Sequence, residues 1–168
     1  RPGRLWHQDL TDMNGAVDTS DRFGFSLAAA DFDNDGYADL AVGVPGDDYV
    51  LGTAATGAAH VIYGASGGLT TTGNALFYHP DLATDDLFGA ALTTADFNGD
   101  GAADLAVGAP LDAPAGANSG SVVTFYGNQS VGLVLTTSET WYPGTNGLQG
   151  TAVADDYFGE ALSGSPRR

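Results

Sequence analysis

Two nine-residue segments carry the acidic residues that are best placed to bind a metal ion. The first runs from Asp31 to Asp39 and has carboxylates at its positions 1, 3, 5 and 9, with glycine at position 6. Ca²⁺ takes six to eight oxygen ligands, so a loop this short must curl tightly to supply them. Gly36 permits the curl because glycine tolerates positive φ. The predicted calcium ligands are the side chains of Asp31, Asp33, Asp35 and Asp39 and the backbone carbonyl of Tyr37.

The second segment, Asp96–Asp104, repeats this pattern with Asn98 in place of one carboxylate. A solvated turn rich in Asp and Gly is the alternative, but such a turn has no need of oxygen ligands at a recurring spacing. We therefore predict a second Ca²⁺ site, which binds more weakly because it offers one carboxylate fewer. Its predicted ligands are the side chains of Asp96, Asn98, Asp100 and Asp104 and the backbone carbonyl of Ala102.

The flanking residues indicate which kind of calcium loop this is. A helix–loop–helix calcium site needs a glutamate at position 12, where the two segments have Val42 and Val107 instead. The apolar runs that follow each segment end in Gly and Pro, as strands that lead into turns do. We therefore predict that each ion lies in a strand–loop–strand hairpin.

Internal repeats set the predicted fold. Segments starting at Asp21, Asp86 and Asp156 begin alike, with an acidic residue two positions before Phe-Gly. Little of the chain shows helical periodicity, so we expect an all-β fold built from β-propeller blades of four antiparallel strands. The strand-like runs are 23–30, 38–44, 58–63 and 75–79 in the first unit and 88–95, 103–109, 121–126 and 139–142 in the second.

The phasing of these runs predicts two complete blades with a strand from each neighbour. The segment Leu5–Leu10 resembles Phe77–Leu82, so we expect it to be a fourth strand, and Phe158–Leu162 a first strand. A closed propeller needs four to eight blades. We therefore expect either a homo-oligomer that completes a propeller or a fragment of a longer chain. Within a single repeat region spanning 1–168, the predicted parts are 1–20 (preceding strand and linker), 21–83 (blade one), 84–150 (blade two) and 151–168 (following strand).

Together these motifs resemble the FG-GAP repeat. Phe88-Gly89, the loop Asp96–Asp104 and Gly108-Ala109-Pro110 match it fully, whereas the first unit has Gly43-Val44-Pro45. The resemblance implies the propeller of integrin α subunits, with one Ca²⁺ in each complete blade. It therefore implies a non-catalytic, secreted or cell-surface binding or adhesion module with a protein or glycan ligand. The alternative is an accessory propeller segment of a secreted hydrolase, because the repeat also occurs in a glycosylphosphatidylinositol-specific phospholipase D.

Composition limits the partners. The 168 residues include 21 acidic residues against five arginines and no lysine, which gives a net charge of −16. Nucleic acid and anionic membrane surfaces need a basic face, so we expect neither as a partner. Membrane insertion is not expected either, because no apolar run reaches the 18 or more residues of a membrane span.

The remaining motifs do not predict catalysis. Gly64–Gly68 matches the Gly-x-Ser-x-Gly pattern of a nucleophile elbow but joins two strand-like runs, which favours a simple turn. His7 and His79 occupy matching places in two units, so packing is favoured over catalysis. The adjacent pairs Asp47-Asp48, Asp85-Asp86 and Asp155-Asp156 are interpreted as solvated turns, with auxiliary calcium ligands as the alternative.

Overall fold

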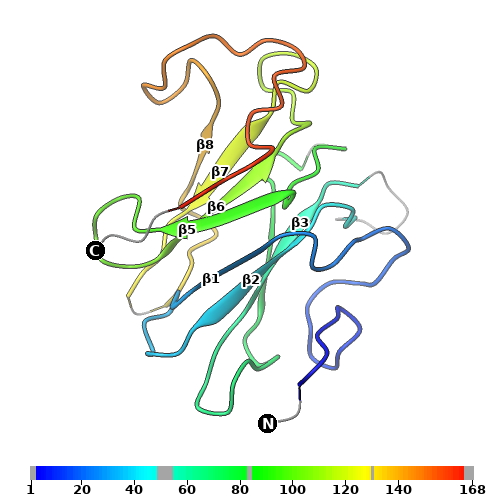
Figure 1. Cartoon of the computed structure of the whole chain (residues 1–168), viewed down its shortest axis with the longest axis vertical. Coiled ribbons are helices and arrows are strands. Elements are labelled where there is room, and N and C mark those ends of the chain that lie inside the picture. The colour runs from blue at the N-terminus through cyan, green and yellow to red at the C-terminus, as the bar shows by residue number, and fades with distance from the viewer. Residues whose placement is uncertain (1–2, 49–54, 83–84, 130, 165–168) are drawn as a thin grey trace.

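The protein is described here from a computed structural model, which covers residues 3–48, 55–82, 85–129 and 131–164. Over this part the regular structure consists of β-strands alone, arranged as two four-stranded antiparallel sheets (Figure 1). In each sheet the strands lie in the order of the sequence, as in a propeller blade. The first sheet contains β1 (Leu27–Ala30), β2 (Asp39–Val44), β3 (Ala58–Ile62) and β4 (Ala75–Tyr78), and the second β5 (Ala91–Ala95), β6 (Asp104–Ala109), β7 (Ser121–Phe125) and β8 (Ser138–Trp141). The predicted all-β fold of four-stranded blades is confirmed.

The inner strands of each sheet are buried on both faces. β3, β6 and β7 are buried along their whole length, and β2 along all but one residue. This is why these segments are continuously apolar or small rather than alternating. Antiparallel pairing sets the register, with Val44 opposite Ala58 in the first sheet and Ala109 opposite Ser121 in the second.

One core joins the two sheets. β5 packs against β1 and β2, and Figure 1 shows β1 and β5 side by side. Phe77 from the first sheet meets Phe125 from the second edge to face, with ring centroids 5.0 Å apart. Phe88 contacts the same Phe125 ring at 6.2 Å, and all three side chains are buried. Burying an aromatic side chain of this size stabilises a fold by roughly 1.5–3 kcal/mol.

Glycines let the repeated turns approach one another. The Gly89 N–H donates to the Gly108 carbonyl at 3.0 Å within the second unit. The Gly89 carbonyl lies so close to Gly43 of the first unit that a Cβ on Gly43 would overlap it. Gly159 stands in the same relation to Gly108. The Phe-Gly turn of one unit therefore packs on the Gly-x-Pro turn of the unit before it.

The first strand of each sheet begins later than predicted. The expected strands started at Phe23 and Phe88, whereas β1 begins at Leu27 and β5 at Ala91. The physical reason is the positive φ of Gly24 (91°) and Gly89 (92°), which turns the chain before it extends. The end residues of several other predicted runs, such as 63, 79, 126 and 142, also lie outside the strands.

Neither expected flanking strand forms over the described residues. Leu5–Leu10 contains a turn, in which the Leu10 N–H donates to the His7 carbonyl at 3.2 Å. Phe158 makes only an isolated parallel bridge to Gly120, because Tyr157 (φ 52°) and Gly159 (φ 89°) turn the chain there. An equivalent bridge joins Phe88 to Gly57. The third Phe-Gly turn therefore lies against the second sheet as the second turn lies against the first.

No helix in the described part of the chain is long and apolar enough to cross a membrane.

Candidate metal centres

The first predicted calcium loop connects β1 to β2. It curls through two residues of positive φ, Asn34 at 59° and Gly36 at 90°. One carboxylate oxygen from each of Asp31, Asp33 and Asp39 lies within 4.8 Å of the other two. The loop therefore brings three of its four acidic side chains together, which is the arrangement that a cation requires.

Asp39 forms the buried floor of this loop. It is 1% exposed, and its carboxylate accepts hydrogen bonds from the N–H groups of Phe32 and Gly64, both at 2.7 Å. Burial raises the pKa of Asp39, the two backbone hydrogen bonds oppose that shift, and the nearby Asp33 and Asp31 carboxylates raise the pKa further. A bound cation would relieve this repulsion between like charges.

The other loop carboxylates accept hydrogen bonds from the loop's own backbone. Asp31 accepts from the N–H groups of Asp35 and Gly36, at 3.1 and 2.9 Å. Asp33 accepts from Asp35 at 3.2 Å, and Asp35 accepts from the Tyr37 N–H at 2.8 Å. These bonds hold the side chains inward. Asp35 lies outside the close group of three carboxylates, and the role of the Tyr37 carbonyl stays a prediction.

The second loop, between β5 and β6, has a similar pattern of hydrogen bonds, but its described acidic side chains do not form a close group of three like that of the first loop. Asp96 accepts hydrogen bonds from the N–H groups of Asp100 and Gly101, both at 3.1 Å. Asn98 accepts from the Asp100 N–H at 2.9 Å, as Asp33 does from Asp35, and its amide donates to Asp100 Oδ2 at 3.0 Å. Asp100 in turn accepts from the Ala102 N–H at 2.8 Å. Asn98 thus replaces one negative charge and binds a neighbouring ligand.

Asp104 repeats the role of Asp39. It is fully buried at the start of β6 and accepts hydrogen bonds from the N–H groups of Phe97 and Gly127, at 2.7 and 2.8 Å. Burial raises its pKa, these hydrogen bonds oppose the shift, and the carboxylate of Asp100 adds to it. Each loop therefore contains one buried aspartate held in place by backbone hydrogen bonds, together with further side-chain oxygens that are mainly carboxylate. This set of donors fits Ca²⁺.

Two glycines that orient the metal-loop aspartates were not among the predicted site residues. Gly64 and Gly127 follow the third strand of each sheet and donate to Asp39 and Asp104. A side chain at either glycine would overlap a backbone carbonyl of the metal loop. The signal was present in the sequence, because a glycine directly follows the third strand-like run in both units.

The predictions for the glycine-rich turn and for the adjacent aspartates are correct only in part. Gly64–Gly68 lies in a turn between two strands, as predicted. The interpretation of the adjacent aspartates as solvated turns is wrong for Asp47 and Asp86, which are 2% and 3% exposed. Asp47 follows β2 and Asp86 precedes β5, two strands that pack against each other at the junction between the units. Burial raises the pKa of both carboxyl groups to about 6. Asp155 and Asp156 are exposed, as predicted.

The histidines differ in their surroundings. His7 is exposed, whereas His60 and His79 are buried. The His60 ring packs edge to face on Phe23 with centroids 5.6 Å apart. His79 lies among carboxylates.

Comparison with known proteins places both sheets in one family. The FG-GAP repeat matches at residues 23–62 and 88–125, which include both loops and the first three strands of each sheet. The chain is also 36% identical to integrin alpha-7 of Mus musculus over 150 residues, 84% of this chain and 11% of that protein. The chain therefore belongs to the FG-GAP repeat family and is built from two integrin α-like repeats.

The chain is also similar to a phospholipase D and to a second integrin alpha subunit. Phosphatidylinositol-glycan-specific phospholipase D of Homo sapiens is 36% identical over 115 residues, 67% of this chain and 13% of that protein. Integrin alpha-PS2 of Drosophila melanogaster is 40% identical over 112 residues, 63% of this chain and 8% of that protein. The chain thus spans only a small part of the length of these relatives.

Proposed function

We propose that this chain is a non-catalytic, calcium-binding part of a secreted or cell-surface propeller that acts in binding or adhesion. The observation that carries the proposal is the repeated loop. Both units hold a fixed, buried aspartate at the end of a loop whose other carboxylates accept hydrogen bonds from the loop backbone, and in the first loop three carboxylates lie close together. The likeness to integrin alpha-7 over most of the chain supports a binding role. In this proposal a protein or glycan ligand meets the loops of a blade face.

Calcium would act as a structural element of each hairpin. It would join the start of the loop to Asp39, and through the Gly64 N–H to the end of β3. In the second sheet the same connection runs through Asp104 and Gly127 to the end of β7. A ligand that binds only the folded state stabilises it, by roughly 2.7 kcal/mol at a hundredfold excess over Kd. We therefore expect the ion to hold three strands of each sheet together.

The experiment is a calorimetric titration of Ca²⁺ into chelator-treated protein, followed by thermal melts with and without the ion. Two bound ions and a melting temperature raised by several degrees are expected. Fewer than two ions, or identical melts, would contradict the proposal.

The likeness to phosphatidylinositol-glycan-specific phospholipase D favours a second candidate, an accessory propeller segment of a secreted hydrolase. The two candidates share the calcium loops and differ in the protein to which they belong. A hydrolase assay on the full-length parent protein distinguishes them. Calcium-dependent retention on an immobilised glycoprotein, without hydrolysis, would favour the adhesion role.

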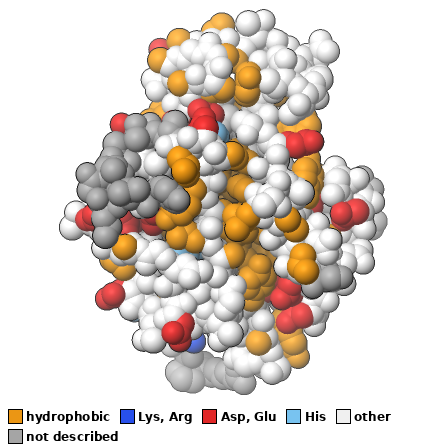
Figure 2. Space-filling view, turned by 180° about the vertical axis from the view of Figure 1, so that it is seen from behind, with side chains coloured by type: hydrophobic (Ala, Val, Ile, Leu, Met, Phe, Trp, Pro, Cys, Tyr) orange, Lys and Arg blue, Asp and Glu red, His pale blue; other side chains and the backbone are white. Residues whose placement is uncertain are grey.

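The charge of the chain supports excluding nucleic acid as a partner. Figure 2 shows acidic side chains spread over one face around a band of hydrophobic ones, with few basic side chains. The two described arginines lie over aromatic rings, Arg4 over Trp6 at 4.2 Å and Arg22 over Phe25 at 5.5 Å. These contacts do not form the clustered basic patch that a phosphate backbone requires.

A further inference from the structure

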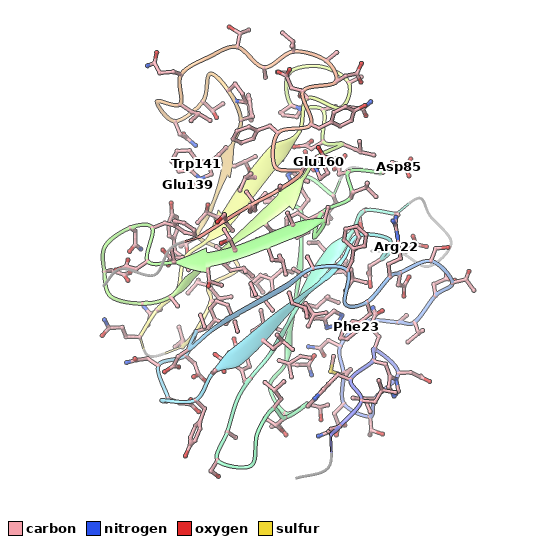
Figure 3. The ribbon with its side chains drawn as sticks, viewed as in Figure 1. Arg22, Phe23, Asp85, Glu139, Trp141 and Glu160 are labelled. Atoms are coloured by element: carbon pink, nitrogen blue, oxygen red, sulfur yellow. The ribbon has the colours of Figure 1, made fainter. Side chains whose placement is uncertain are left out.

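A second group of possible metal ligands lies at the junction between the two sheets, apart from the calcium loops. His79 and Asp81 follow β4 of the first sheet, Asp86 precedes β5, and Asp112 follows β6. One donor atom from each of His79, Asp81 and Asp86 lies within 4.8 Å of the other two. Asp85, next to Asp86 in the sequence, marks this region in Figure 3, near the start of β5.

The two ring nitrogens of His79 face different partners. His79 is 3% exposed. Its Nδ1 is 2.5 Å from Asp81 Oδ1. Its Nε2 is 3.3 Å from the Ser121 hydroxyl and 3.4 Å from Asp112 Oδ2. In the structure Nδ1 forms a hydrogen bond with Asp81. With the ring proton on Nε2, which faces Ser121 and Asp112, a cation between Nδ1 and Asp81 would replace that hydrogen bond.

Asp86 supplies an independent sign that a ligand is missing. Its side chain is 3% exposed, and its Oδ2 atom has no hydrogen-bond partner among the described residues. A buried carboxylate oxygen without a partner is costly and calls for an explanation such as an ion. The residue lines a pocket of about 400 Å³ that it shares with Asp81 and Asp112, so an ion has a way in.

The corresponding position in the first sheet is satisfied by neutral donors instead. Asp47 follows β2 as Asp112 follows β6. It accepts hydrogen bonds from the Gln8 amide at 2.8 Å and from the Tyr78 hydroxyl at 3.2 Å. In the second sheet His79 takes the place of that amide beside Asp112. The two units therefore differ at this position, because the second combines an imidazole with several carboxylates where the first has a carboxylate with neutral donors.

We propose that His79, Asp81 and Asp86 bind a divalent transition-metal ion such as Zn²⁺ at this junction. One imidazole nitrogen with two carboxylate oxygens is a donor set that suits Zn²⁺, with water in a fourth position. Ca²⁺ is disfavoured because it prefers more numerous, all-oxygen ligands. Asp112 and Ser121 hold the other ring nitrogen and fix the tautomer, as outer partners of metal-binding histidines do. The ion would clamp the end of β4 to the start of β5.

The test is a titration of Zn²⁺ into the whole chain with Ca²⁺ in excess, so that the calcium loops are filled. We expect one additional site, and Co²⁺ in place of Zn²⁺ should give visible absorption bands. Asp86→Asn and His79→Gln should each weaken Zn²⁺ binding at least about tenfold. His7→Gln is the matched control because His7 is the exposed counterpart of His79, and it should bind as the parent does.

A wild-type measurement keeps the proposal testable if the variants fold poorly. NMR of the histidine ring protons during the Zn²⁺ titration should show a shift for His79 and none for the buried His60. Absence of a stoichiometric Zn²⁺ site in calcium-saturated protein would overturn the proposal. Parent-like affinity in folded Asp86→Asn protein, or an unchanged His79 signal on saturation, would do so as well. The calcium titration is separate, so failure here leaves the calcium proposal standing.

Discussion

Individual carboxylates have different surroundings within each predicted calcium loop. Asp39 and Asp104 are buried and accept hydrogen bonds from residues that follow the first and third strands of their sheet, whereas Asp35 and Asp100 are exposed at the curl. In the proposed calcium sites, the buried residue would fix where the ion lies, and the exposed ones would close over it. Exposed ligands can move toward an ion at little cost, so the number of carboxylates is expected to set the affinity.

We predict that Asp31→Ala and Asp96→Ala each remove one of two calcium sites and that the site left by Asp96→Ala is the tighter one. The loop starting at Asp31 has four carboxylates, and the loop starting at Asp96 has three with Asn98. Calorimetric titration of each variant measures this. Asp9→Ala is the matched control, since Asp9 is exposed and outside both loops. Two sites in either loop variant, or a reversed order of affinities, would refute the prediction.

His60 gives the protein a pH dependence of its own. It is fully buried, both ring nitrogens lack partners among the described residues, and burial lowers its pKa to about 4. The unfolded chain, with an ordinary histidine pKa near 6.5, binds the proton more readily. The stabilising contribution is therefore present above pH 6.5 and is lost as pH falls toward 4, by roughly 3 kcal/mol in all.

Comparison of the parent with His60→Leu by chemical unfolding between pH 4 and 7 tests this. The buried carboxyls of Asp47 and Asp86 act in the opposite sense, since their folded pKa of about 6 lies above the unfolded value. The difference in slope between variant and parent therefore isolates His60, and the variant should lose less stability on acidification. Parallel curves for His60→Leu and the parent would contradict the assignment.

At this scale the sequence predicted more about the loops than about the sheet junction. The spacing of carboxylates within one short segment can be seen in the sequence, and the positive φ of Gly36 and Gly101 lets the loop backbone curl as that spacing predicts. The burial of Asp86 and its approach to His79 depend on how two units pack, which no local pattern records. His79 was therefore predicted only as a packing residue, although its ring lies among carboxylates.

At the scale of elements, the repeated turns explain why glycine stands where it does. The carbonyl of Gly89 reaches the Cα of Gly43 and also accepts a hydrogen bond from Ser26 Oγ at 2.7 Å. This contact joins the end of β2 to the entry of β5. It leaves no space for a methyl group, although Gly43 does not have a positive φ.

We predict that Gly43→Ala destabilises the protein by about 1–3 kcal/mol or more, since the new methyl group must displace backbone rather than a mobile side chain. Urea unfolding with Ca²⁺ present measures the loss. Gly67→Ala is the matched control, because no atom lies within 4 Å of a Cβ built there and its φ is not positive. Equal stability of the two variants would show that the sheets separate easily at this turn.

The strands were largely predictable, and their ends were not. The inner strands read as continuous apolar runs because they are buried on both faces, so β2 and β6 lie close to the predicted ranges. β1 and β5 were predicted to begin too early. The Phe of each Phe-Gly pair favours a strand, but the positive φ of the glycine turns the backbone there. A hydrophobic pattern reports burial, and it does not report the sign of φ.

At the scale of the whole molecule, the second sheet has one face that is covered only in part. The first sheet is covered by β5, whereas the second is covered only in part by residues 158–164. A pocket of about 490 Å³ opens over this face, lined by Phe97, Val122, Trp141 and Leu162 among others. Figure 3 shows Trp141 and Glu139 on β8, at the outer edge of the sheet. Exposed apolar faces of this kind favour association.

Two opposing forces decide whether copies of the chain associate through this face. Burial of the apolar pocket favours contact, whereas a net charge of −16 on each copy opposes it. Two bound Ca²⁺ ions would change that charge to −12, from −16 plus twice +2. Association is therefore expected to depend on calcium, and head-to-tail contacts of this type close into a ring if the rotation between copies allows it.

We predict that the calcium-loaded chain self-associates at micromolar concentration through the outer face of the second sheet. Light scattering should show a mass above that of the monomer with Ca²⁺ and a smaller mass with chelator. Trp141→Ala should weaken the association because it removes the largest apolar side chain lining the pocket. Leu5→Ala is the control, an equally apolar but exposed residue remote in sequence from that sheet. A folded, strictly monomeric chain would contradict self-association and would favour a further blade of a longer chain as the cover of this face.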